Sequence, residues 1–389
     1  MSNIWLINGT VITGYLSQEK CCIYVEDGQI GDVISLKRFQ EKKIPADALV
    51  YDVKGAWITP GFIDSHIHGF GGFGTEDGKK ESILGMSEKL AGYGVTSFCP
   101  TVYSNTPEAM LSSIIAIVEA KGEETGATIL GIHLEGPFIS VKRLGAQNKE
   151  GCSPVDMELM DKLFQAGKGL ITNMTVAPEL KGMRELALYC LKKGITLQAG
   201  HTDAAYENMV EGMQAGILHS THFFNAMSRL HHRNPGAVGA IMIHPEMSCE
   251  IIADGEHVHP ELLRLLMRDK PVSKVVLVTD ALKPTEQEHG PFKANHEEVE
   301  LVDNVFKKKN GVLAGSCLTM IRGIENLVSW GVPIEQAVQM AGSNPARILG
   351  NPKLGNLVPG SDADITVFDK QFNVLVTIAK GRILKNLIS

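Results

Sequence analysis

The sequence predicts an α/β fold, a (β/α)8 TIM barrel joined to a small β-sandwich domain that both chain termini form. Two observations lead to this prediction. The middle of the chain alternates apolar, β-branched runs with stretches of helical periodicity, whereas both ends contain short strand-like runs separated by glycine turns. A length of 389 residues suits one large barrel with one small extra domain.

Eight apolar runs in the middle of the chain match the number of strands that a closed (β/α)8 barrel requires. Most are separated by segments with helical periodicity, such as 107–121 and 183–193. The connection from Asn225 to Met247 is rich in loop-forming residues, so this unit is the least well defined. The runs span residues 57–67, 95–102, 128–134, 170–176, 195–199, 220–224, 249–253 and 274–279.

The two ends of the chain share a strand-rich character. The run Ile4–Ile7 leads into the Asn8-Gly9 turn, and residues 364–368 and 374–378 repeat this pattern near the C-terminus. We expect 1–57 and 355–389 to form the β-sandwich domain, and 58–354 to form the barrel. A doubly wound sheet is the alternative, but the sequence has no GxGxxG or Walker loop to mark the ligand crevice of such a sheet.

Composition excludes several classes of partner. The net charge of -7, from 37 basic and 44 acidic residues, argues against nucleic acid or an anionic membrane. No apolar run approaches the 18 residues of a membrane span, and the N-terminus does not resemble a signal peptide. Seven cysteines without a CxxC pair suit a reducing compartment, so we expect a cytoplasmic protein.

Residues that bind metals or move protons stand at the ends of five of the eight predicted strands. In a barrel the carboxyl ends of all strands meet at one mouth, where active sites lie. Chance is a poor explanation for such a pattern in segments so far apart in sequence. These residues are His66, His68, His133, Glu135, His201, His222 and Asp280.

The His66-Ile67-His68 segment places two imidazoles on one side of an extended strand. Together with the other histidines and carboxylates they suit one or two divalent ions, of zinc, iron or manganese. Such an ion lowers the pKa of bound water to about 7 and polarises a carbonyl, which favours hydrolysis. Asp280 is the candidate to take the proton of the attacking water and deliver it to the leaving amine. A serine nucleophile is disfavoured because no GxSxG elbow occurs.

Other histidines have competing interpretations. His133 lies two residues before Glu135, so it faces the site or packs beside it. His219 begins its strand and is expected at the bottom of the barrel, outside the site. The adjacent His231 and His232 lie in a polar loop and are expected to be solvated.

Seven blocks of sequence resemble the amidohydrolase superfamily and, within it, the N-acetylglucosamine-6-phosphate deacetylases. The His-x-His pair marks only the superfamily, whereas the HLEGP, GHT and THFFNAM blocks together are specific to the deacetylases. The resemblance extends over nearly the whole chain. The blocks span residues 60–69, 133–138, 199–204, 221–227, 253–258, 278–281 and 313–316.

The resemblance implies removal of acetate from N-acetyl-D-glucosamine 6-phosphate, a step of amino-sugar catabolism and recycling. It also implies that Glu135, His201 and His222 hold the principal metal. Some members lack the His-x-His pair and bind one metal. This chain keeps His66 and His68, so a second metal is expected, with Glu135 as the bridging ligand where many superfamily members use a carboxylated lysine.

Substrate contacts follow from the same resemblance. Arg233 resembles the phosphate-binding arginine of the family, and acts in its own site or in that of a neighbouring subunit of a homodimer. Asn225, Ala226 and His257 are expected to contact the sugar phosphate. Gln147 stands where some members have histidine, so it can hydrogen-bond a hydroxyl but cannot shuttle protons.

Two other functions stay open. One is a different amidohydrolase, such as a cyclic-amide hydrolase or a deaminase on the same barrel, which would have no need of Arg233. The other is a scaffold protein without catalysis. A scaffold would be expected to lose metal ligands or the acid/base residue, and this chain retains all of them.

Overall fold

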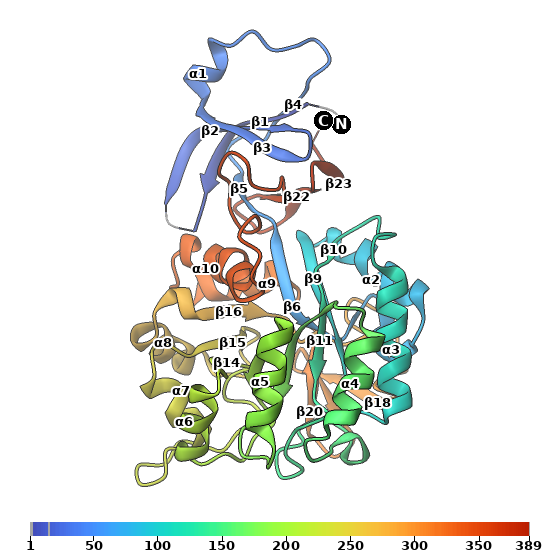
Figure 1. Ribbon diagram of the computed structural model, residues 1–389. Coiled ribbons are helices and arrows are strands. Elements are labelled where there is room, and N and C mark those ends of the chain that lie inside the picture. The colour runs from blue at the N-terminus through green and yellow to red at the C-terminus, as the bar shows by residue number, and fades with distance from the viewer. Residues whose placement is uncertain (1–2, 15, 389) are drawn as a thin grey trace.

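The computed structural model describes residues 3–14 and 16–388, which form a parallel barrel sheet and a mixed sheet from both ends of the chain (Figure 1). In the barrel, hydrogen-bonded neighbours follow chain order, and each pair is parallel. The predicted (β/α)8 fold class is therefore confirmed. The barrel strands are β6 (Phe62–Ile67), β9 (Val95–Val102), β11 (Ile132–Glu135), β12 (Ile171–Val176), β13 (Thr196–Ala199), β14 (His219–Ser220), β15 (Ser248–Ile252) and β16 (Val275–Val278), with β10 (Thr128–Ile129) added beside β9.

Hydrogen bonds between the first and last strands close the barrel. The backbone amide of Asp280 donates to the carbonyl oxygen of His66 (2.9 Å). The buried Asp64 carboxylate accepts from the hydroxyl of Thr279 (2.6 Å) and from its amide (3.3 Å). These bonds join segments more than 200 residues apart in sequence.

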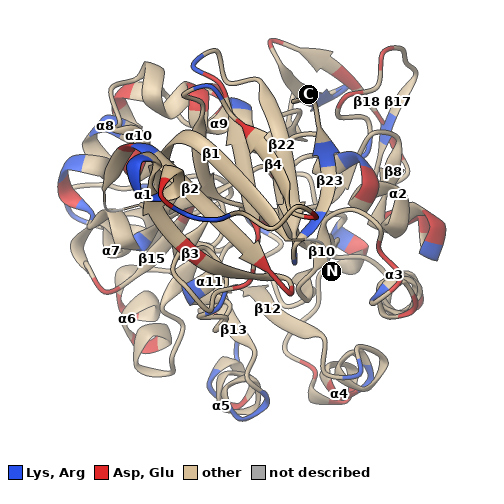
Figure 2. Cartoon of the chain, turned by 90° about the horizontal axis from the view of Figure 1, so that it is seen from above, with Lys and Arg blue, Asp and Glu red and all other residues tan. Residues whose placement is uncertain are grey.

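Helices cover the outside of the barrel, and each packs its apolar residues inward. For example, α3 begins at Pro107, is capped by the side chain of Thr106, and buries Met110, Ile114 and Ile117. The outer helices carry charges of both signs (Figure 2). Their bounds are α2 (Lys80–Ala91), α3 (Pro107–Ala120), α4 (Met157–Ala166), α5 (Met183–Lys193), α6 (Tyr206–Gln214), α7 (Gly236–Ile243), α8 (Pro260–Asp269), α9 (Met320–Ser329), α10 (Ile334–Ala341) and α11 (Ser343–Ile348).

Helix α7 lies within the segment expected to be rich in loops. Its sequence, from Gly236 to Ile243, is apolar on every side, and six of its eight residues are buried. A helix without a polar face has no amphipathic period, so sequence periodicity could not reveal it. Across the described residues, no helix is both long and apolar enough to span a membrane.

The mixed sheet contains strands from both termini, in the order β23-β22-β21-β5-β1-β2-β3, with β4 beside β1. Its apolar core combines residues from both ends, among them Leu6, Ile23 and Val367. The small terminal domain is thus confirmed, whereas its predicted borders at 57/58 and 354/355 stay a prediction. Its elements are β1 (Ile4–Ile12), β2 (Ser17–Glu26), β3 (Gln29–Ser35), α1 (Leu36–Gln40), β4 (Leu49–Asp52), β5 (Trp57–Pro60), β21 (Ile365–Phe368), β22 (Val374–Ala379) and β23 (Arg382–Asn386).

Two small antiparallel sheets lie in loops that follow barrel strands. Strand β6 enters the barrel directly from β5 of the terminal sheet, so the carboxyl ends of the parallel strands open on the opposite side (Figure 1). The strands of these two sheets are β7 (Gly69–Phe70), β8 (Phe73–Gly74), β17 (Phe292–Ala294), β18 (Glu297–Val302), β19 (Val305–Lys308) and β20 (Leu313–Ser316).

The buried carboxyl of Asp364 gives a stability prediction at the contact of the two sheets. Burial raises its pKa to about 6, although the amide of Lys380 (2.7 Å) and the hydroxyl of Ser97 (3.4 Å) donate to it. Because the folded pKa exceeds the unfolded value of about 3.9, its stabilising effect is present below pH ~4 and lost as pH rises through ~6. Asp364→Asn, which does not titrate, should therefore gain melting temperature relative to wild type between pH 4 and 7.

The matched control is Asp369→Asn, directly after β21. There, burial raises the pKa, but hydrogen bonds from Asn373 outweigh it and lower the pKa below its ordinary value. The pH-dependent contribution of Asp369 therefore lies below pH ~4, and the melting temperature of Asp369→Asn relative to wild type should stay constant between pH 4 and 7. Melting temperatures measured from pH 4 to 7 test both expectations. A difference between Asp364→Asn and wild type that stays constant with pH would contradict the prediction.

Candidate active site

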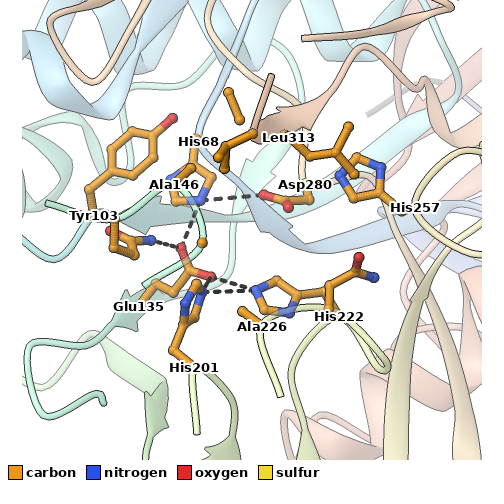
Figure 3. A pocket seen from close by; sticks show the side chains of 16 residues that line it. His68, Tyr103, Glu135, Ala146, His201, His222, Ala226, His257, Asp280 and Leu313 are labelled. Atoms are coloured by element: carbon orange, nitrogen blue, oxygen red, sulfur yellow. Dashed lines mark hydrogen bonds and ion pairs between the residues drawn. The ribbon is translucent and has the colours of Figure 1, made fainter. Parts of the chain in front are cut away.

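A cavity of about 210 Å³ opens at the carboxyl ends of the barrel strands. Residues from separate strand ends converge on it, among them His68, Glu135, His201, His222 and Asp280 (Figure 3). Each of these five residues is at most 8% exposed. The barrel therefore gathers the predicted ligands into one buried group.

The first group of possible metal ligands is Glu135, His201 and His222. The Nε2 atoms of the two histidines each lie 3.0 Å from Oε1 of Glu135. They lie 3.1 Å from each other, so all three atoms point to one place (Figure 3). The Nδ1 atom of His201 is 3.0 Å from the carbonyl oxygen of Arg143, to which it can donate, leaving Nε2 free to bind an ion.

The second group is His66, His68 and Asp280. Oδ1 of Asp280 lies 3.5 Å from Nε2 of His66 and 3.4 Å from Nε2 of His68. Glu135 lies between the two groups, because its Oε1 is 3.5 Å from His66 Nε2 and its Oε2 is 3.1 Å from His68 Nε2. The two groups thus share one carboxylate.

The donor set fits divalent cations. Four-coordinate zinc with nitrogen ligands at 2.0–2.1 Å has ligand atoms about 3.3 Å apart, close to the spacings above. Among the described residues, the buried Nε2 of His66 has no hydrogen-bond partner. An unpaired imidazole nitrogen that faces two carboxylates is suited to an ion, and imidazole and carboxylate ligands accept zinc, iron and manganese.

Electrostatics at the site also favour cations. Burial lowers the pKa of His66, but Asp280, Glu250 and Glu135 outweigh burial and raise it to about 10. Burial alone would raise the pKa of Glu135, yet His66 and His201, with hydrogen bonds from the histidines, hold it well below its usual range. The carboxylates together impose a negative field that positive charge stabilises.

Three of these residues have a left-handed backbone that non-glycine residues rarely adopt. The φ angles are 46° at His201, 25° at His222 and 50° at Asp280. Each such conformation costs on the order of 1 kcal/mol or more and persists only where the surroundings enforce it. At Asp280 the surroundings are two strand ends, since its amide donates to His66 and its carbonyl accepts from Ser316 (3.0 Å).

His133 lies beside the site and is not one of the grouped ligands. Its Nδ1 is 3.1 Å from the hydroxyl of Thr101, and its Nε2 is 2.9 Å from the hydroxyl of Thr175. Both nitrogens of His133 therefore have hydrogen-bond partners. Its ring packs edge-on against the ring of His66, with the ring centroids 4.5 Å apart. Of the two interpretations that the sequence left open, the structure favours packing.

Most of the predicted substrate-binding residues line the cavity, namely Gln147, Asn225, Ala226 and His257. Gln147 donates from Nε2 to Glu135 and accepts from the amide of Ser104 (3.0 Å). Arg233 is exposed and is not among the residues that line the cavity of its own chain. His231 and His232 are exposed as well, as expected for solvated residues.

His219 is buried next to Ser248 and does not line the cavity, which agrees with its exclusion from the site. Two buried residues near the ligands were not singled out from sequence. Tyr103 stacks on the ring of His68, with centroids 3.7 Å apart. Glu250 pairs with His66 (2.9 Å). A lone acidic residue inside the apolar run Cys249–Ile252 was the available signal for Glu250.

A model of the Amidohydrolase family matches residues 57–384, and with the barrel and its buried ligand groups this makes the chain an amidohydrolase. The chain is 35% identical to N-acetylglucosamine-6-phosphate deacetylase of Bacillus subtilis, over 92% of this chain and 91% of that protein. It is 34% identical to the protein of the same name from Vibrio furnissii, over 84% and 82%. The chain belongs to the N-acetylglucosamine-6-phosphate deacetylase family.

Solved structures agree with this assignment. The deacetylase of Pasteurella multocida superimposes with a TM-score of 0.92 at 28% identity, covering 99% of this chain and all of that one. A mutant of the Mycobacterium smegmatis deacetylase, in complex with N-acetyl-D-glucosamine-6-phosphate, gives 0.90 at 27% identity over the same shares. The resemblance inferred from the sequence motifs is thus confirmed.

The two ligand groups predict two divalent ions per chain. Wild-type protein dialysed against zinc should bind two ions, and His66→Asn should bind one, because Glu135, His201 and His222 remain intact. Metal content measured by emission spectroscopy checks the stoichiometry. His244→Asn, a half-buried histidine hydrogen-bonded to Tyr206, serves as the control and should keep both ions. Retention of two ions by His66→Asn would refute the assignment of the second group.

Proposed function

We propose that this chain hydrolyses the acetamide of N-acetyl-D-glucosamine 6-phosphate to D-glucosamine 6-phosphate and acetate. The observation that supports this most directly is the pair of ligand groups joined through Glu135. They lie at the mouth of a barrel whose relatives are named for this reaction. The family and the buried site thus point to the same chemistry.

In this proposal Glu135, His201 and His222 hold the principal divalent ion, and His66 and His68 hold a second, with Glu135 between them. The ion is zinc, iron or manganese. When bound, a divalent ion makes water more acidic and polarises the acetamide carbonyl. The remaining chemistry is proton transfer and positioning, which belong to the protein.

Asp280 is proposed as the general acid/base. It lies in the cavity wall, and its Oδ1 is within 3.5 Å of the nitrogens of His66 and His68. It takes a proton from the attacking water and then delivers that proton to the nitrogen of the leaving amine. Its strained backbone, held at both amide and carbonyl, fixes the carboxylate for these transfers.

Substrate contacts are assigned to polar groups of the cavity wall. Asn225, Ala226 and Gln147 offer amide and backbone groups to the sugar. The side chain of His257 is only 4% exposed, and hydrogen bonding to Asp254 (2.6 Å) outweighs this burial and raises its pKa. A histidine whose cationic form is favoured in this way is suited to the phosphate or a sugar hydroxyl.

Arg233 is proposed to reach the phosphate in the site of a neighbouring subunit. It is exposed and absent from the residues that line the cavity of its own chain, yet its planar fork of donors suits a phosphate. A homodimer that places this loop over the partner's cavity reconciles the two facts. The subunits would then complete one another's sites.

The deacetylation itself is tested by acetate release from purified, metal-loaded protein. We expect rapid release from N-acetylglucosamine 6-phosphate and much slower release from unphosphorylated N-acetylglucosamine. At saturating zinc, where weaker binding at the second group is offset, Asp280→Asn should still lower kcat by about 10²- to 10⁴-fold, because it removes proton transfer. If no acetate is released with zinc, iron or manganese, the proposed function is wrong.

Shared sites predict that two inactive variants restore each other. Arg233→Ala should lower kcat/KM for the phosphorylated substrate by about 10- to 100-fold, since a charge-assisted hydrogen bond contributes about 1.5–3 kcal/mol. Arg229→Ala, exposed four residues earlier, is the control and should act like wild type. After subunit exchange with Asp280→Asn, about a quarter of the sites have both residues intact if Arg233 acts across a dimer.

Acetate release from the mixture distinguishes the two arrangements. If each subunit uses its own arginine, every site in the mixture lacks either Arg233 or Asp280, and no activity returns. If Arg233→Ala acts like wild type on the phosphorylated substrate, the arginine has no part in phosphate recognition, and a different amidohydrolase reaction becomes the better candidate.

A further inference from the structure

Glu250 is a fully buried carboxylate that the proposed reaction does not use. It is the third residue from the end of β15, in the interior of the barrel, and its side chain has no exposed surface. A carboxylate in such a place is costly unless its oxygens are well paired. The partners of Glu250 therefore indicate why it is there.

One oxygen of Glu250 contacts both ligand groups. Oε2 accepts a hydrogen bond from Nδ1 of His66 (2.9 Å) and another from the backbone amide of His222 (3.2 Å). The other oxygen, Oε1, accepts from Nε2 of Gln198 (3.1 Å). A single side chain thus touches one histidine of each ligand group, and both contacts are made from below the cavity.

The contact with His66 determines which ring nitrogen is free. In the neutral ring, the form that binds an ion, Nδ1–H donates to Glu250 and the lone pair is on Nε2, which faces Glu135 and Asp280 at 3.5 Å each. A carboxylate behind a histidine in this way fixes the tautomer and ring orientation and makes the ring a stronger metal ligand. This explains why Nε2 of His66 is unpaired in so buried a position.

The contact with His222 supports a residue that the sheet does not hold. Strand β14 consists of His219 and Ser220 only, so His222 lies beyond the end of its ladder. Its φ of 25° is strained, and the bond from its amide to Glu250 helps to keep that conformation. The ring of His222 is thereby kept directed at Glu135.

We propose that Glu250 is a positioning residue that orients His66 toward the second metal ion and holds the backbone of His222 beneath the first. The inference rests on the proposed function, because it assigns a role relative to the same two ions. The contact with His66 is to the ligand ring itself, whereas the contact with His222 is to the backbone. Loss of Glu250 should therefore affect the second ion more than the first.

Glu250→Gln removes the charge with little change of shape. We expect zinc at the second site to bind about 10- to 100-fold more weakly, the range found when an outer partner of a metal ligand is replaced. Zinc at the first site should weaken less. Equilibrium dialysis across a range of free zinc measures both affinities, and the absorption spectrum of the cobalt-substituted protein should show altered coordination. Asp364→Asn, another buried carboxylate, is the matched control and should leave both affinities unchanged.

Added metal provides a second readout that a structural role would not change. At low free zinc, acetate release by Glu250→Gln should fall, and excess zinc should restore most of it. Asp280→Asn should not recover, because its defect is in proton transfer. If Glu250→Gln does not fold, Glu250→Asp is the second variant. It keeps the charge but is one methylene shorter, so it cannot reach both His66 and His222. It should also lose zinc from the second site before the first.

The outcomes separate this inference from the proposed function. If wild type releases no acetate, the proposed function fails whatever Glu250 does. If wild type is active and the variants bind both ions with wild-type affinity, Glu250 is not a positioning residue, even where their melting temperatures fall. Weakening of the first site alone would also overturn the proposal.

Discussion

Closure of the barrel is the constraint on which the site depends. The amide of Asp280 donates to the carbonyl of His66, and the Asp64 carboxylate accepts from both the hydroxyl and the amide of Thr279. Burial raises the pKa of Asp64 to about 7, and the hydrogen bonds from Thr279 oppose that rise. Because the first and last strands meet here, the His66–His68 pair and Asp280 form one ligand group although they lie far apart in sequence.

The ligand groups are shaped by the need to stabilise buried charge. Glu135, Glu250 and Asp280 are all buried within the reach of His66, and each carboxylate taken out of water requires positive charge or hydrogen bonds in return. The histidines supply part of this, and divalent cations would supply the rest. The same arrangement that costs stability without cations makes the site selective for them.

Much of the site could be predicted because barrel geometry maps sequence position onto space. Glu135, His201 and Asp280 could be placed together from sequence, since each ends or closely follows a strand whose end lies at the same mouth. Depth along a strand was harder to infer. His133 shares a face with Glu135 but lies two residues, about 6.6 Å, farther from the mouth, where threonine hydroxyls occupy both its nitrogens.

Other features could not be predicted because they depend on contacts across the fold. Glu250 is an isolated acidic residue in an apolar strand. In the sequence it looks like a simple interruption of the apolar run, and only its contact with His66 in the fold indicates a positioning role. The segment around Arg233 shows no period, and the apolar helix α7 that follows has no polar face to mark it. The proposed place of Arg233 depends on a second subunit. The strand pattern of a single chain cannot predict a contact between subunits.

An anionic substrate adds a further demand on this site. The cavity wall includes Glu135 and Asp280, and the chain has a net charge of -7, so an approaching sugar phosphate meets repulsion from the protein alone. Cations must offset that repulsion in the deep part of the cavity and at the phosphate. In the proposed arrangement, divalent ions at the ligand groups would offset the repulsion near the acetamide, and His257 and Arg233 would offset it at the phosphate end of the substrate. If divalent ions activate water as proposed, they are also part of substrate recognition, and a chain that lost them would lose binding together with chemistry.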